Sequence, residues 1–414
     1  MKKFLSILSL ESKAIVRSGM FAVLLFASVA WMLLLPLFIK GDGTAEGAHE
    51  LYVRFSLGGV FVLLAVSLLA SATGSVAKER AAKRLQLTLV RPVGRFAVAL
   101  GKVVAHALCG AVILSGASLV LIFKVDVSKF CDHVTAPIMH SPAQEAKTMY
   151  EHYMNDPSTP EEVKRAKKSV VMRILTQRAV DNYQTVSTNE TAKWSFQVPQ
   201  GDALSVRMRF TNQFDMRQTV LGEFICDGVG TSVSNMTQAV LKMPLNNKVN
   251  GGGLKELSFR NLGANAVMLR PRKDLNLLVS ADAFGWNLVR ALLELSAILT
   301  LLVAAGVFLS AGLSRPVALF VALAVLLAGE VSPSVISQYP DELETNVADR
   351  IGLALTRFSA EVTRPFSSLS PLESLSRDEC VERSEVVRVL IVDCAVMPIV
   401  FCLMATFLMP RKQD

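Results

Sequence analysis

The sequence predicts an α-helical integral membrane protein with six transmembrane helices and an α+β domain inserted between spans three and four. Three observations predict this fold class. Hydrophobic residues make up 51% of the 414 residues, more than an ordinary soluble domain contains. Apolar runs recur that, at ~1.5 Å per residue, are long enough to cross a ~30 Å hydrocarbon core. Between residues 124 and 285 the pattern changes to short alternating segments, which favours a helical part followed by a β-sandwich-like part.

Residues 1–19 mix apolar and charged residues at helical spacing. This pattern predicts an amphipathic helix lying in the membrane interface. Ser18-Gly19 is expected to end it. The start resembles a signal peptide, but Glu11 and Lys13 interrupt its apolar stretch and no cleavage site follows, so no cleavage is expected.

Residues 20–123 contain three predicted spans and, between the second and third, a basic loop at 77–97. Residues 286–414 contain three more spans and a loop at 339–385. A short acidic link at 41–50 joins the first two spans. The predicted spans are Met20–Ile39, Phe55–Val76, Val98–Phe123, Trp286–Leu313, Pro316–Gln338 and Val386–Met409.

Basic residues gather at one side of these spans, whereas the short loop on the other side holds only Lys40 and Arg54. By the positive-inside rule both termini are cytoplasmic, and 124–285 and 339–385 are extracytoplasmic. The expected location is the cell inner membrane. The basic residues on the cytoplasmic side are Lys2, Lys3, Lys13, Arg17, Lys78, Arg80, Lys83, Arg84, Arg91, Arg95, Arg315, Arg411 and Lys412.

The extracytoplasmic domain at 124–285 begins with helical patterns. Ser141–Asn155 forms one, and Ser158-Thr159-Pro160-Glu161-Glu162 opens another with an N-cap hydroxyl, an early proline and acids in the first turn. Alternation then predicts an antiparallel sheet in the form of a small sandwich. The expected strands include 194–198, 204–210, 221–226, 257–259, 266–269 and 275–279.

Several functional classes find no support in the composition. The net charge of +8 and pI near 9.2 would suit nucleic acid, but the basic residues flank apolar runs, so no nucleic-acid partner is expected. No nucleophile–base pair or dinucleotide fingerprint occurs, and we expect neither an enzyme nor a bound cofactor. Cys131, Asp132, His133, His140 and His152 lie near one another without the spacing of a metal site.

The cysteines show no C-x-x-C pairing. In an oxidising compartment Cys131 and Cys226 could form a disulfide. Cys380 is also predicted to be extracytoplasmic, so the number of cysteines on that side is odd. The sequence leaves this pairing open.

The basic loop at 77–97 has an ordered pattern. It runs from Lys78-Glu79-Arg80 through a leucine-rich turn to Arg91-Pro92-Val93-Gly94-Arg95, and Gly101-Lys102 opens the third span. This pattern resembles the cytoplasmic loop of ABC-2 type transporter permeases. The insert between spans three and four is similar to the branch grouped with gliding-motility and copper-enzyme-maturation systems. Lys83-Arg84 stand where that family usually has Gly-Thr.

The resemblance implies a permease subunit that moves an unidentified substrate, with export the commoner direction. It would pair with a second permease half, identical or different, and with ABC-type ATPase subunits that bind ATP and Mg²⁺. No G-x-x-x-x-G-K-[ST] motif occurs in this chain, so ATP hydrolysis is expected in the partner. The other interpretation is a basic loop that serves topology alone. The residues expected to contact the ATPase are Glu79, Arg80, Arg84, Leu85, Leu89, Arg91, Pro92 and Arg95.

Ionisable residues inside the spans form a second candidate set: Arg290, Glu294, Glu330, Arg388 and Asp393. Such residues are costly in hydrocarbon and face a bundle interior or a cavity. At ~1.5 Å per residue the three acids are expected in one layer ~12 Å below the outer surface. The layer is either an outer gate that contacts substrate or a set of internal charge pairs that fixes helix packing.

Two other whole-protein hypotheses remain. In the first, the chain is a membrane-anchored sensor or scaffold whose extracytoplasmic domain binds a partner. In the second, it is a membrane enzyme that uses the intramembrane carboxylates. A periplasmic partner is compatible with the permease as well.

Overall fold

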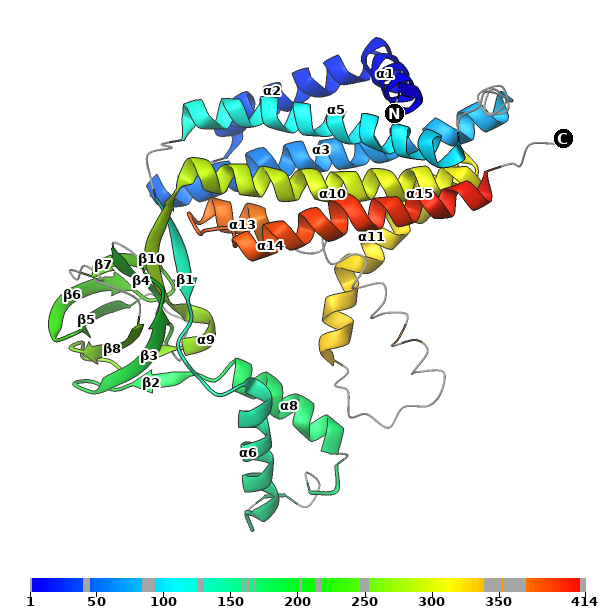
Figure 1. Cartoon of the computed structure of the whole chain (residues 1–414). Coiled ribbons are helices and arrows are strands. Elements are labelled where there is room, and N and C mark those ends of the chain that lie inside the picture. Colours follow the sequence, from blue (N-terminus) through cyan, green and yellow to red (C-terminus); the bar gives the residue numbers. More distant parts are fainter. Residues whose placement is uncertain are drawn as a thin grey trace. The chain divides into compact units, whose positions relative to one another are not determined.

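The computed structural model divides the chain into two compact units (Figure 1). We call residues 1–129, 283–335 and 350–414 the membrane unit, and residues 130–282 with 336–349 the sandwich unit. The described part of the chain excludes residues 1, 40–44, 84–93, 126–129, 158, 161–163, 167, 201–202, 213–217, 246–252, 339–351, 353, 355–369 and 410–414.

The membrane unit is helical. Five of its helices are long and apolar enough to cross a membrane, which supports a multi-pass membrane protein. The fifth predicted span, 316–338, is helical, but its described apolar part, Arg315–Leu326, is shorter than a span. The elements are α1 Lys2–Arg17, α2 Met20–Phe38, α3 Ala45–Ala81, α5 Arg95–Lys124, α10 Phe284–Gly312, α11 Arg315–Gln338, α13 Ser370–Ser376, α14 Arg383–Val389, η1 Leu390–Val396 and α15 Met397–Leu408.

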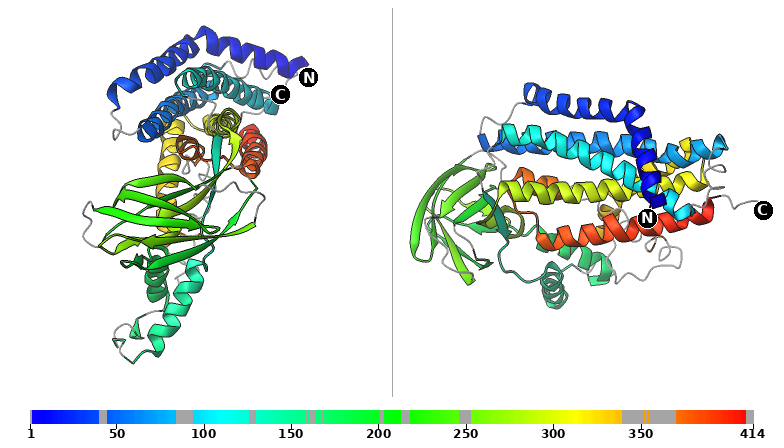
Figure 2. Two further views of the ribbon diagram at one scale, coloured as in Figure 1. Left: turned by 90° about the vertical axis from the view of Figure 1, so that its left-hand side faces the viewer. Right: turned by 45° about the horizontal axis from the view of Figure 1, so that its top comes forward.

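The amphipathic helix α1 ends where the sequence predicts. Gly19 adopts a left-handed φ of 74° between α1 and α2, a conformation that glycine adopts without steric cost. As a result α1 runs across the long helices rather than along them (Figure 2). The next helix, α3, begins at Ala45, so much of the acidic stretch expected to be a link is helical.

Helix α10 is the centre of the membrane unit and packs against α3, α5 and α15 (Figure 1). Its buried residues recur along most of its length, including Asn287, Ala291, Glu294 and Ile298 at helical spacing. The last span is not regular throughout: α14, η1 and α15 are continuous, and η1 is a π-helical stretch. Pro398 follows it and lacks the N–H that would bond to Cys394, so the helix widens before the proline.

The sandwich unit contains two four-stranded sheets and one two-stranded sheet. Their strand orders are β1-β10-β4-β7, β3-β8-β5-β6 and β2-β9. The strands are β1 Phe130–Thr135, β2 Gln184–Val186, β3 Thr191–Val198, β4 Leu204–Arg209, β5 Thr219–Cys226, β6 Val229–Met236, β7 Val240–Leu245, β8 Gly253–Asn261, β9 Val267–Leu269 and β10 Leu275–Ala283.

Alternate residues of β3 and β4 are buried, as their sequences predict. The core centres on Phe259, whose ring centroid lies 4.8 Å from that of Phe210 and 5.0 Å from that of Phe224. The strand β8 that carries Phe259 pairs antiparallel with β3 and β5, so this residue joins the middle of its sheet to the core.

Two helices precede the sheets in the sandwich unit. Helix α6, Pro142–Asn155, begins with a capping box made by Ser141 and Gln144. It packs against α8, Lys168–Val180, through a small apolar cluster. The predicted helix start at Ser158–Glu162 lies largely outside the described residues, and α8 begins further along the chain.

Candidate functional site

A buried lysine joins three helices at the end of the membrane unit that carries the basic loop. The Lys102 side chain on α5 is only 1% exposed. Its Nζ donates to Glu11 Oε1 on α1 at 2.5 Å and to Glu79 Oε1 on α3 at 2.8 Å. We call these three residues the lysine triad. An ammonium group so deeply buried needs such partners, because an unpaired buried charge is costly.

The preceding residue allows α1 to come this close. A Cβ built on Gly101 would lie 2.7 Å from Ile7 Cγ2, nearer than real side-chain contacts permit. Glycine at 101 therefore brings α1 against α5 and Glu11 within reach of Lys102. In the sequence, Gly101-Lys102 was interpreted only as the start of the third span. One signal could have revealed the lysine triad: a lysine inside an apolar run, with acidic residues on two neighbouring helices.

Arg80, one of the predicted coupling residues, caps the end of α10. Its Nη1 and Nη2 atoms donate to the carbonyl oxygens of Ala311 and Leu313, each at 2.8 Å. The last carbonyls of a helix lack partners within the helix, and a cation there also interacts favourably with the helix dipole. Arg80 therefore ties the end of α3 to the end of the central helix.

Other coupling residues flank or lie within the loop. Glu79 belongs to the lysine triad, and Arg95 is the first residue of α5. Arg84, Leu85, Leu89, Arg91 and Pro92 lie outside the described residues. The described part therefore brings together the two flanks of the loop, and the predicted contact with an ATPase remains a prediction.

Lys83 adopts a backbone conformation that is unusual for lysine. Lys83 has a left-handed φ of 55°, and its N–H donates to Arg80 O at 3.0 Å just after α3 ends. A left-handed residue after a helix is usually glycine, because it has no Cβ to clash. The chain therefore makes a glycine-type turn with lysine, and α3 ends at Ala81.

The lysine triad borders a cavity of about 460 Å³ between α1, α3, α5 and the start of α11. His106 forms part of its wall. Its Nδ1 lies 2.8 Å from Lys102 O and its Nε2 3.0 Å from Ser71 Oγ, so both ring nitrogens have partners. His106 is therefore a packed, hydrogen-bonded histidine.

The predicted intramembrane layer is described only in part. Glu294 is 2% exposed, and its Oε1 has no hydrogen-bond partner among the described residues. No ion pair joins it to Arg290 or Asp393 within that part of the chain. Asp393 is buried on the widened η1 and is attracted by Arg388, which is exposed. The Glu330 side chain lies outside the described residues.

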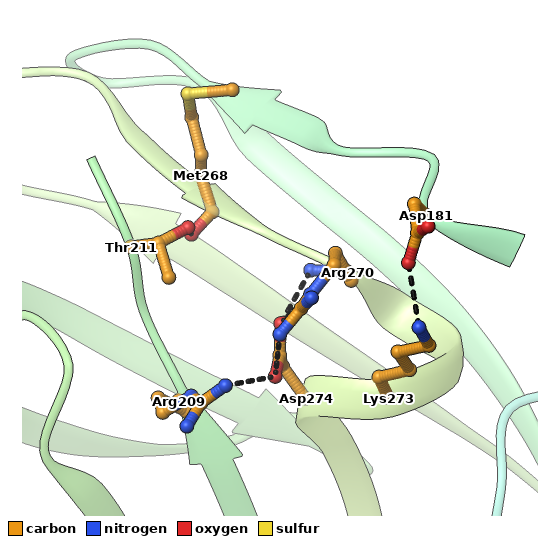
Figure 3. Close-up of polar contacts among 7 residues, drawn as sticks. All are labelled: Asp181, Arg209, Thr211, Met268, Arg270, Lys273 and Asp274. Carbon is orange, nitrogen blue, oxygen red and sulfur yellow. Dashed lines mark hydrogen bonds and ion pairs between the residues drawn. The ribbon is translucent and has the colours of Figure 1, made fainter. Parts of the chain in front are cut away.

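A polar cluster in the sandwich unit is structural (Figure 3). Asp274, the last residue of the short helix α9 Pro271–Asp274, accepts from Arg270 Nε at 2.7 Å and Nη2 at 3.1 Å, and Arg209 Nη2 lies 3.4 Å away. Lys273 donates to Asp181 at 2.6 Å, which lowers the pKa of that carboxyl. Every charged group in this cluster has a partner, and it holds α9 and the chain before β2 to the sheets.

The cysteine, aspartate and histidines between residues 131 and 152 were not expected to form a metal site. No cluster of three or more metal-binding side chains occurs in the described chain. Asp132 instead accepts from Ser280 Oγ at 2.9 Å and pairs with Lys242 Nζ at 2.8 Å.

The disulfide between Cys131 and Cys226 that the sequence left open does not form. Cys131 and Cys380 are disulfide-bonded, whereas Cys226 keeps its thiol. Cys226 lies at the end of β5 in the core of the sandwich, and its burial raises the pKa of the thiol.

Comparison with known proteins adds little. No family model and no curated protein matches this chain. Among solved structures, the chain is similar to a family GH115 4-O-methyl-α-glucuronidase with specificity for decorated arabinogalactans, at 13% identity and a TM-score of 0.19. The match covers 24% of this chain and 14% of that one, so the chain spans a small fraction of its length. A similarity this low supports no conclusion about fold or function.

Proposed function

We propose that this chain is the membrane-spanning permease subunit of an ABC transporter, which exports an unidentified substrate using ATP hydrolysis by a separate ATPase subunit. The observation that carries the proposal is the anchoring of the described residues on both sides of segment 84–93. Glu79 on one flank is bonded to Lys102 on the other, and Arg80 is bonded to the end of α10. Force applied to this loop would reach α1, α5 and α10 through short polar contacts.

A loop that only sets topology needs basic residues but no such contacts. Those contacts favour a loop that transmits force over one that serves orientation alone. The subunit would act with a second permease half, identical or different, and the ATPase would bind ATP and Mg²⁺.

Co-purification tests this proposal. The full-length chain is expected to bring down an ABC-type ATPase, and replacing Leu85, Leu89 and Arg91 together with alanine should reduce recovery of that ATPase by about tenfold or more. The matched control replaces Leu5, Leu10 and Arg17, which belong to α1, where the two leucines are 52% and 68% exposed. Recovery of a partner through the sandwich unit alone, with no ATPase, would favour the sensor or scaffold hypothesis instead.

The orientation we propose places both termini in the cytoplasm of the inner membrane. Its support comes from the cysteines as well as from the basic residues. Disulfides persist in oxidising compartments, and Cys131 and Cys380, both disulfide-bonded, belong to the two regions proposed to lie outside.

Thiol labelling of intact cells tests this orientation. After reduction, a membrane-impermeant maleimide should label Cys131 and Cys380 from outside, since reduction frees both thiols. A Lys83→Cys substitution, at an exposed position beside the loop, should be labelled only after the cells are opened. Labelling of Lys83→Cys in intact cells would show that the topology is the reverse of the one proposed. Double substitution of Cys131 and Cys380 by serine is the control that identifies the outer signal.

A further inference from the structure

Two exposed cations line the cavity, Lys78 on α3 and Arg315 on α11. A Cβ built on Gly74 would lie 3.2 Å from Arg315 Nε and 3.6 Å from Lys78 Cε. The two side chains, one from α3 and one from α11, therefore converge beside the same glycine. Neither makes an ion pair with any described side chain. Like charges this close repel each other, so the arrangement favours an anion between them.

The rest of the cavity lining cannot supply that anion. Its two acidic residues, Glu11 and Glu79, are both bonded to Lys102. Among the lysine, arginine and glutamate side chains of the lining, three are basic and two are acidic, which leaves one excess positive charge in this set. A bound group with a single negative charge would neutralise it.

The start of α11 adds to the attraction. Arg315 is its first residue, so the positive end of the helix dipole lies at the cavity. Helix N-termini bind phosphate groups for this reason. Here the helix end acts together with two side-chain cations in an open pocket of about 460 Å³.

We propose that this cavity binds a phosphate-bearing anion, held by Lys78 and Arg315. The source that fits the surroundings best is the headgroup of an anionic phospholipid. The cavity is also lined by Ile15 of the amphipathic helix α1 and by Met20 of α2, so apolar side chains adjoin the polar ones. Basic pockets between membrane helices on the cytoplasmic side bind such headgroups. The site does not depend on whether an ATPase drives this chain.

Lipid binding to the purified full-length chain tests the site. The delipidated protein is titrated with phosphatidylglycerol, with phosphatidylcholine, or with inorganic phosphate, and bound lipid is counted by native mass spectrometry. Phosphatidylglycerol should bind in preference to phosphatidylcholine. In a Lys78→Gln, Arg315→Gln variant the phosphatidylglycerol concentration for half-occupancy should rise by about tenfold or more, because each basic residue contributes to headgroup attraction.

The control variants separate this site from general surface charge. Lys13→Gln with Arg17→Gln removes two exposed cations of α1 that do not line the cavity and should leave binding unchanged. Lys78→Arg with Arg315→Lys keeps both charges and should retain binding. If millimolar inorganic phosphate displaces the lipid, the site is a phosphate site whose ligand is soluble. If the glutamine variant binds phosphatidylglycerol and phosphate as the unmodified chain does, the proposal is overturned.

Discussion

Replacing Lys102 with methionine is expected to destabilise the membrane unit by about 3–5 kcal/mol. Methionine fills a similar volume, so the loss comes from charge rather than from packing. Without the ammonium group, Glu11 and Glu79 face each other as two partly buried carboxylates with no cation between them. Like charges that share a site repel, and each has lost water on burial. Thermal unfolding of the detergent-purified chain measures the effect.

Two further variants identify the cause. Lys124→Met alters an exposed lysine at the opposite end of the same helix and should leave the unfolding temperature nearly unchanged. Adding Glu11→Gln and Glu79→Gln to Lys102→Met should recover part of the lost stability, because neutral amides tolerate each other's proximity. An unfolding temperature that Lys102→Met does not lower would mean that the triad contributes nothing to packing of the three helices.

Replacing Phe259 with alanine is expected to cost the sandwich unit about 3–5 kcal/mol. The ring is fully buried and lies against Phe210 and Phe224, so its removal leaves a cavity that the strands on either side cannot close. Cys226 reports on this loss, since its thiol is 2% exposed in the same core. The rate of maleimide labelling at Cys226 should rise by about 100-fold or more if labelling requires the core to open.

The labelling experiment uses a Cys394→Ser background, because Cys394 is an exposed free thiol. Leu254→Ala is the matched control: it shortens a side chain on the same strand that is 68% exposed, so the rate should hardly change. Equal labelling rates in the Phe259 and Leu254 variants would show that the aromatic cluster does not hold this core together.

The extent of sequence-based prediction differs between the two units. Strand β3 was predictable because every second residue faces one core, which imposes alternation on the sequence. Strand β6, Val229–Met236, was missed because it lies at the edge of its sheet, pairs only with β5 and is largely exposed. Strand β1 was missed as well, since its buried Asp132 is satisfied by Lys242 and Ser280 rather than by apolar neighbours.

The sequence by itself determined the apolar helices, the amphipathic first helix and the position of the inserted sheet domain. These follow from hydrophobic length and period, which each segment carries alone. Only the tertiary structure decided which charges meet: Lys102 with Glu11 and Glu79, Arg80 with the end of α10, and Lys78 beside Arg315. Ion pairs and helix caps join residues far apart in the chain, and no local pattern encodes their partners. For the same reason the cysteine pairing could not be read from spacing.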